Sequence, residues 1–79
     1  MIYLAITAEG VQWAIQAATS QDAVWCGCDA ISDEEYAAIN GVSLSRFVYA
    51  LGDHSSIVDA LATIEEHHPG QPIWVEAAG

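Results

Sequence analysis

Lysine is absent from this sequence, and arginine occurs once, as Arg46, against eleven aspartate and glutamate residues. The formal net charge is −10 at pH 7, so nearly every carboxylate lacks a basic side chain with which to pair. A chain with this field repels nucleic acid and anionic membranes, whereas it attracts basic surfaces. The composition therefore argues against direct nucleic-acid or membrane binding and favours a positively charged partner. Solubility or adaptation to high salt is the alternative explanation.

Export signals and membrane spans are lacking as well. No stretch approaches the roughly 20 apolar residues that are needed to cross a bilayer. The apolar residues 1–6 have no basic residue beside them and are too short for a secretory signal. We therefore expect a cytoplasmic protein.

The two cysteines, Cys26 and Cys28, are separated by a single residue. This gap is too short for the cysteine pairs of structural zinc sites and for the Cys-x-x-Cys motif of thiol redox proteins. A disulfide across it would be strained. We expect reduced thiols, no metal and no cofactor. A small cytosolic thiol or metal protein that uses both cysteines and the histidines is the alternative.

No arrangement typical of catalysis is found. The serines near His54 are explained by turns and helix caps, and the neighbours Glu34 and Glu35 diverge on a helix. No glycine-rich phosphate loop occurs. His67 and His68 are expected at a helix C-terminus, where a cation interacts favourably with the helix dipole. We predict no catalytic residues and no enzymatic activity.

Hydrophobic residues make up 53% of the chain, which is enough for one compact domain over residues 1–79. Residues 1–7 are rich in Ile, Tyr and Leu and are predicted as a strand. Residues 11–17 alternate with a period of two, which favours a second strand paired with the first as a hairpin. A helix over residues 10–18 is the alternative, because Val11 and Ala14 also fit a period of 3.6.

Helices are expected next in the chain. A short one is predicted over residues 20–25, with a break near Gly27. Ser32 followed by Glu35 forms a capping box, which predicts a helix that begins at this point. Asn40 and Gly41 tolerate a left-handed conformation and are expected to close it.

The last third of the chain predicts a strand, a helix and a strand. Residues 45–51 alternate, and both sets are largely apolar, which favours a central strand. A helix is expected from Ser55 or Ser56 to His67, and residues 72–77 form the last strand. The order β-β-α-α-β-α-β predicts an α+β domain, with a four-stranded mixed sheet covered by two or three helices. The last two strands are expected to be joined by a parallel crossover.

The acidic residues gather in two regions of the sequence. Carboxylates on a helix face lie about 5–6 Å apart, a spacing that roughly imitates the phosphates along one DNA strand. A groove that holds DNA with lysine and arginine would bind such a surface. The residues predicted to bind a partner are Asp29, Asp33, Glu34, Glu35, Asp53, Asp59, Glu65 and Glu66.

In its size, its compact α/β pattern, its single Arg46 and these acidic regions, the chain resembles the small acidic anti-CRISPR proteins of phages and prophages. The resemblance is strongest to inhibitors of type I surveillance complexes, the type I-C subtype among them. It implies a stoichiometric inhibitor in the cytoplasm of the bacterial host. Such an inhibitor binds a Cascade-like complex and blocks target DNA without catalytic turnover.

Two further hypotheses remain open from the residues. The chain is alternatively a DNA mimic of another basic DNA-binding protein, such as a nucleoid protein, a repressor or a restriction enzyme. The aromatic residues Trp13, Trp25, Tyr36 and Trp74 are predicted in the core, with an interface role as the alternative. A monomer is expected, because the negative charge opposes self-association.

Overall fold

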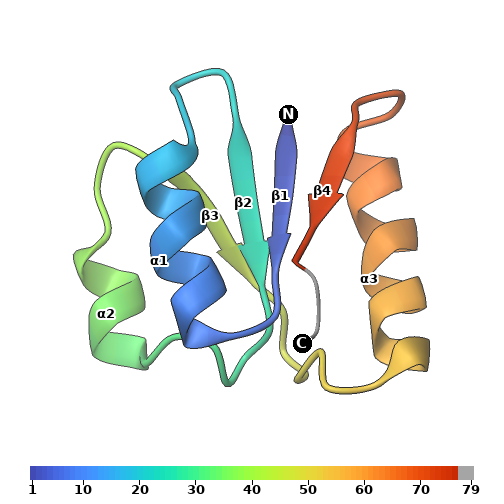
Figure 1. Cartoon of the computed structure of the whole chain (residues 1–79), viewed down its shortest axis with the longest axis horizontal. Coiled ribbons are helices and arrows are strands. Elements are labelled where there is room, and N and C mark those ends of the chain that lie inside the picture. The colour runs from blue at the N-terminus through green and yellow to red at the C-terminus, as the bar shows by residue number, and fades with distance from the viewer. Residues whose placement is uncertain (77–79) are drawn as a thin grey trace.

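The computed structural model describes residues 1–76. Strands and helices alternate through this part of the chain (Figure 1). The elements are β1 (Ile2–Ala5), α1 (Ala8–Ala17), β2 (Ala23–Cys26), α2 (Asp33–Ala38), β3 (Ser43–Arg46), α3 (His54–His67) and β4 (Ile73–Val75). The prediction of a small domain with a four-stranded sheet covered by helices is confirmed.

The four strands form one sheet in the order β3-β2-β1-β4, and every neighbouring pair is parallel. The prediction of a mixed sheet is therefore wrong, and so is the predicted element order. Each parallel pair requires a crossover between its strands, and the chain supplies one helix for each crossover. The expected parallel relation of the last two strands is present, although β4 pairs with β1 and not with β3.

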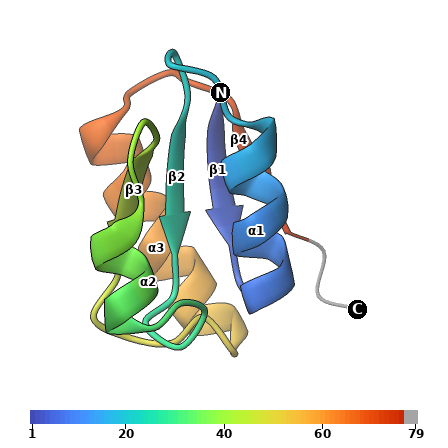
Figure 2. The same cartoon turned by 90° about the vertical axis from the view of Figure 1, so that its left-hand side faces the viewer.

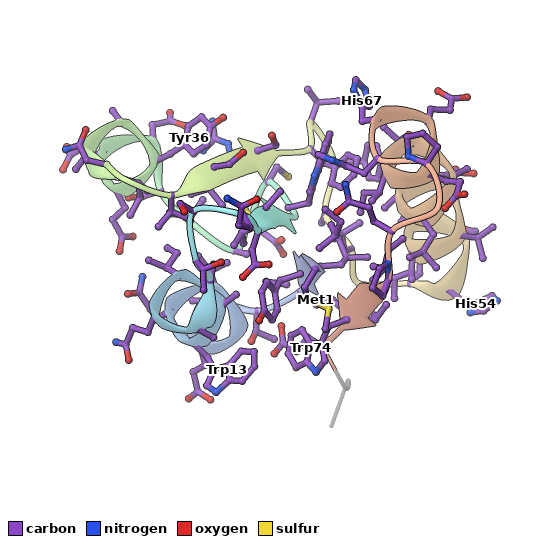
Figure 3. The ribbon with its side chains drawn as sticks, turned by 90° about the horizontal axis from the view of Figure 1, so that it is seen from above. Met1, Trp13, Tyr36, His54, His67 and Trp74 are labelled. Carbon is purple, nitrogen blue, oxygen red and sulfur yellow. The ribbon has the colours of Figure 1, made fainter. Side chains whose placement is uncertain are left out.

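Helices cover both faces of the sheet (Figures 2 and 3). Ile2 and Leu4 of β1 pack with Ala60 and Ile64 of α3 on one face. Ala5, the alternate residue of the same strand, packs with residues of α1 and of the α2 region on the other face. This alternation follows from the pleat of a strand, in which successive side chains point to opposite faces. The core is thus divided by the sheet into two layers.

Residues 11–17 form most of α1, so the predicted second strand and hairpin are wrong and the alternative of a helix holds. Val11 and Ala14 are buried against the sheet, while Trp13 is exposed. The helix begins at Thr7, whose Oγ1 accepts a hydrogen bond from Gly10 N–H at 3.1 Å. The period of two was misleading because Trp13, an apolar residue, faces solvent.

The helix predicted over residues 20–25 is also wrong, because β2 runs from Ala23 to Cys26. Asp22 closes a turn and does not start a helix. Its Oδ2 accepts hydrogen bonds from N–H and Oγ1 of Thr19 at 2.8 and 3.0 Å. The four residues of β2 lie between β1 and β3 and are covered on both faces. So short an apolar run has no periodicity that separates a strand from a helix.

The strand predicted over residues 45–51 is displaced. β3 spans Ser43–Arg46 and lies at an edge of the sheet, not at its centre. Phe47 and Leu51 are buried as expected, but they lie in the loop that follows, where Val48 is 93% exposed. The apolar side chains of this loop fill the space between the sheet and α3.

The ends of the other helices are close to their predicted positions. α2 begins with the complete capping box of Ser32 and Glu35. Gly41 adopts a positive φ of 79° after this helix, as expected, whereas Asn40 does not. α3 ends at His67, with His68 as its C-cap. β4 falls within the predicted residues 72–77, of which Ala77 lies outside the described residues.

Candidate functional site

The start of α2 carries four of the eight carboxylates predicted to bind a partner. Asp29 lies in the loop after β2, and Asp33, Glu34 and Glu35 form the first turn of the helix. We call these four residues the α2 acidic cluster. All four are exposed. The positive end of the helix dipole stabilises acidic residues at this position, so the fold tolerates the local concentration of negative charge.

Glu35, one member of the α2 acidic cluster, takes part in the capping box of α2. Ser32 Oγ accepts a hydrogen bond from Glu35 N–H at 3.1 Å, and Ser32 N–H donates to Glu35 Oε1 at 3.4 Å. The Glu35 carboxylate therefore has a structural task at the helix terminus. Asp29 and Glu34 have no such bond among those found in residues 1–76.

Arg46, the one lysine or arginine of the sequence, forms an ion pair within the chain. Its Nη2 lies 2.7 Å from Asp33 Oδ1, and its Nη1 donates to the carbonyl of Ile31 at 3.4 Å. Its guanidinium carbon lies 5.0 Å from the ring centroid of Tyr36, within the range of a cation–π contact. One positive charge thus offsets one of the four carboxylates of the α2 acidic cluster.

The other four predicted residues belong to α3 and its N-cap. Asp53, Asp59, Glu65 and Glu66 are spread along α3 from its N-cap to its last turn, and all four are exposed; we call this set the α3 acidic cluster. Asp53 caps the helix, because its Oδ1 accepts hydrogen bonds from Ser56 N–H at 2.8 Å and from Ser55 Oγ at 2.9 Å. The backbone bond from Ser56 is the main reason why the pKa of Asp53 is lowered.

The two acidic clusters lie on opposite sides of the molecule. α2 packs against one face of the sheet and α3 against the other, as the view from above shows (Figure 3). The structure therefore does not bring the eight predicted residues together on one surface. It distributes them over two faces of a body that measures 29 × 25 × 22 Å.

The histidines of α3 take the position expected for them. His67 ends the helix and His68 caps it, and their rings lie 5.4 and 6.1 Å from that of Trp25. Within residues 1–76, no group of three or more His, Cys, Asp or Glu side chains is arranged to hold a metal ion.

The two cysteines differ in their surroundings. Cys26 is buried in β2, and Cys28 is partly exposed in the loop that follows. Burial raises the pKa of the Cys26 thiol to about 11. Cys26 is consequently a neutral thiol at pH 7, which is the weakly reactive form.

One carboxylate that the sequence did not single out occupies a distinctive place. β1 and β4 are neighbours in the sheet, and the Glu76 carboxylate lies at their carboxyl ends, where β1 leads into α1. Its Oε1 accepts hydrogen bonds from Ile6 and Thr7 N–H at 2.6 and 2.8 Å, and its Oε2 accepts from Thr7 Oγ1 at 2.5 Å.

Glu76 thus fills the position where an anion would meet the N-terminus of α1. Burial opposes its ionisation, but the hydrogen bonds from Thr7 and Ile6 outweigh this effect and lower its pKa. Gly10 makes room for the carboxylate, because a Cβ at this residue would overlap it. No signal in the sequence could have identified this contact before α1 and the position of β4 were known.

No pocket is found on the part of the surface formed by residues 1–76, and no helix in this part is long and apolar enough to cross a membrane. Comparisons with protein-family models, with curated proteins and with solved structures give no match for this chain.

Proposed function

We propose that this protein is a stoichiometric inhibitor that binds a basic DNA-binding complex through its acidic surfaces and excludes DNA from it. The partner that we propose is a type I CRISPR surveillance complex of the Cascade kind, in the cytoplasm of a bacterial host. In this function the chain acts as an anti-CRISPR protein without catalytic turnover.

The observation that carries this proposal is the commitment of Arg46 to Asp33 and Tyr36. The only lysine or arginine side chain of the sequence is thereby occupied within the α2 acidic cluster. The other exposed carboxylates face solvent, where their mutual repulsion destabilises the fold. A cationic partner would neutralise that repulsion on binding and would gain long-range electrostatic attraction.

The placement of the acidic clusters favours a groove over a flat surface as the binding partner. A channel that holds nucleic acid has basic side chains on both of its walls. The α2 and α3 acidic clusters face opposite directions from one compact body, so each can contact one wall. Occupation of such a channel blocks DNA by competition, with no change to the chemistry of the complex.

The state of the α1 N-terminus supports a protein partner in preference to a phosphate-bearing ligand. Glu76 already accepts the hydrogen bonds that a phosphate would use at this position. A nucleotide would also meet the repulsion of the negatively charged chain. The N-terminus of α1 is thus already occupied by a carboxylate of the same chain.

The test uses pairs of substitutions that spare the residues with structural tasks. One variant carries Asp29→Asn and Glu34→Gln in the α2 acidic cluster, and another carries Asp59→Asn and Glu66→Gln in the α3 acidic cluster. The control variant, Asp29→Glu with Glu34→Asp, preserves the charge. Purified type I complexes are incubated with each protein, and target DNA binding is measured at several salt concentrations.

We expect each neutralised pair to weaken inhibition and to reduce its dependence on salt, and the combined variant to lose inhibition. The control should inhibit as the unmodified chain does. Full inhibition by a folded combined variant would overturn the electrostatic mechanism. Capture of a repressor, a nucleoid protein or a restriction enzyme, with no binding to any type I complex, would overturn the proposed partner.

A further inference from the structure

Three aromatic side chains form a cluster at the edge of the sheet where α1 passes β4. The rings of Trp13 and Trp74 are stacked, with 4.7 Å between their centroids and 29° between their planes. Tyr3 of β1 lies 5.8 Å from Trp13 and 5.9 Å from Trp74. We call these three residues the indole patch, of which Trp13 and Trp74 are labelled in Figure 3.

Trp13 is the exposed member of the indole patch, because 51% of its surface is accessible to solvent. The prediction that it lies in the core is therefore wrong. Trp74 and Tyr3 are half-buried beside it. The stacked arrangement holds the exposed indole in one orientation, so a ligand would bind it without the cost of ordering a mobile side chain.

A carboxylate accompanies the exposed indole. Glu9 precedes Trp13 by four residues in α1, a spacing that places both side chains on the same side of the helix. Glu9 is exposed. The second nearby carboxylate, Glu76, follows β4 and is held at the start of α1. The patch thus combines an aromatic face with negative charge at its rim.

We propose that the indole patch binds an arginine side chain of the basic partner. The guanidinium stacks on Trp13, and the Glu9 carboxylate accepts hydrogen bonds from it. This inference rests on the proposed function, because it assigns a contact point for a basic partner. It adds a site outside the α2 and α3 acidic clusters.

Arginine fits this patch better than the other occupants do. Its planar guanidinium stacks on an aromatic face while it pairs with a carboxylate, whereas the ammonium of lysine is a compact and strongly hydrated charge. A purely apolar side chain would leave Glu9 without a partner. A second copy of this chain would bring together two surfaces of charge −10, which opposes the contact at low salt.

The direct test uses a short peptide of alternating arginine and glycine, and a matching peptide with lysine. The indole N–H signals of the three tryptophans are followed by NMR during titration. Trp25 is the internal control, because its Nε1 is buried and it packs beneath α3, on the face opposite α1. We expect the signals of Trp13 and Trp74 to shift with the arginine peptide at lower concentration than with the lysine peptide.

Two substitutions complete this test. Trp13→Leu and Glu9→Gln should each weaken binding of the arginine peptide by about two- to fivefold, the size expected of an exposed cation–π contact or charge-assisted bond. Trp13→Phe should retain part of the affinity. Equal affinity for both peptides, equal shifts of the Trp25 signal, or unchanged binding by Trp13→Leu would overturn the proposal. So would a dimer in sedimentation that Trp13→Leu abolishes, because it would identify a second copy as the occupant.

The outcome for the indole patch is separable from that for the acidic clusters. In binding to the intact basic complex, Trp13→Leu should lower affinity without changing its dependence on salt. Neutralisation of the acidic clusters should change that dependence. If Trp13→Leu left the affinity unchanged while neutralisation of the acidic clusters altered its salt dependence, the arginine site would be wrong and the proposed function would stand.

Discussion

The junction of α1 with β4 and the two acidic clusters use the same chemical group in opposite ways. At the junction, the Glu76 carboxylate is turned inward and accepts three hydrogen bonds from Ile6 and Thr7. In the α2 and α3 acidic clusters, residues such as Glu34 and Asp59 are exposed to solvent. The comparison shows that a carboxylate held by hydrogen bonds stabilises the fold, whereas carboxylates exposed without a partner, such as Glu34 and Asp59, contribute repulsion.

Asp53 and Glu35 lie between these extremes. Both belong to an acidic cluster, and both cap a helix through hydrogen bonds to the backbone. Their charge serves the fold locally and contributes to the surface field. The residues suited to a test of function are therefore the cluster members without a cap or an ion pair.

The largest effect that we expect is the loss of the inward carboxylate. Glu76→Ala removes a charged acceptor from three donors, so it should lower the free energy of unfolding by about 2 kcal/mol. Urea denaturation measures the change, with Glu9→Gln as a control that should remain within about 0.5 kcal/mol. Equal effects of the two substitutions would contradict the distinction between the two kinds of carboxylate.

The difference in the free energy of unfolding between the unmodified chain and Glu76→Ala should depend on pH. The pKa of Glu76 is lowered from its ordinary value of 4.5 in the folded state. A group of this kind stabilises the fold fully above its unfolded pKa, and the contribution is lost as the pH falls through the folded pKa. The gap in stability between the unmodified chain and Glu76→Ala should therefore be constant near neutral pH and should narrow as the pH falls below the ordinary pKa of 4.5. A gap that widens on acidification would be inconsistent with an ionised Glu76.

A third prediction concerns Gly10, which faces the Glu76 carboxylate from α1. Alanine in place of glycine in a helix usually stabilises by about 1 kcal/mol. Here the new Cβ would displace the carboxylate from its donors, so Gly10→Ala should destabilise the unmodified chain. In the Glu76→Ala background the same substitution should stabilise. Calorimetric unfolding of the four proteins measures this coupling, and additive effects would show that the two residues are independent.

The smallest effect should appear at the α2 acidic cluster and should have the opposite sign. Asp29→Asn with Glu34→Gln relieves repulsion between exposed carboxylates, so we expect a gain of a few tenths of a kcal/mol at low salt. The gain should vanish at high salt, where exposed charges are screened. Thermal unfolding in dilute and concentrated NaCl measures it. A loss of stability would mean that these side chains support the fold.

The sequence predicted those parts of the fold that depend on neighbouring residues. The capping box of Ser32 and Glu35 and the end of α3 at His67 are confirmed, because each depends on residues within one or two helical turns. Gly41 also marks the end of its helix with a positive φ. Local hydrogen bonding and backbone preference are present in the sequence itself.

The errors concern short apolar segments and contacts between distant residues. Residues 11–17 fit both the period of two of a strand and the period of 3.6 of a helix. The helix is favoured because it buries Val11 and Ala14 against the sheet. β2 is too short to show a period at all. The hydrogen bond from Thr7 to Glu76 joins residues that are 69 positions apart, so no local sequence pattern predicts it. The order of strands in a sheet depends on the whole chain. β1 and β2 can pair in parallel only because residues 8–17 form a helix that connects them.

The candidate site was predictable in composition but not in shape. Charge counting identified the eight carboxylates, and each is exposed as expected. The sequence could not show that the α2 and α3 acidic clusters face opposite directions, because this depends on which face of the sheet each helix covers. It also placed Trp13 in the core, where the indole patch instead leaves it half exposed.

The most direct test of the central claim is a competition between this protein and target DNA for a purified type I surveillance complex, measured over a range of salt concentrations. We expect the unmodified chain to displace DNA, with an affinity that falls steeply as salt rises. The folded variant with Asp29, Glu34, Asp59 and Glu66 neutralised should fail to do so. If that variant displaced DNA as well as the unmodified chain and with the same salt dependence, exposed negative charge would not be what the partner recognises.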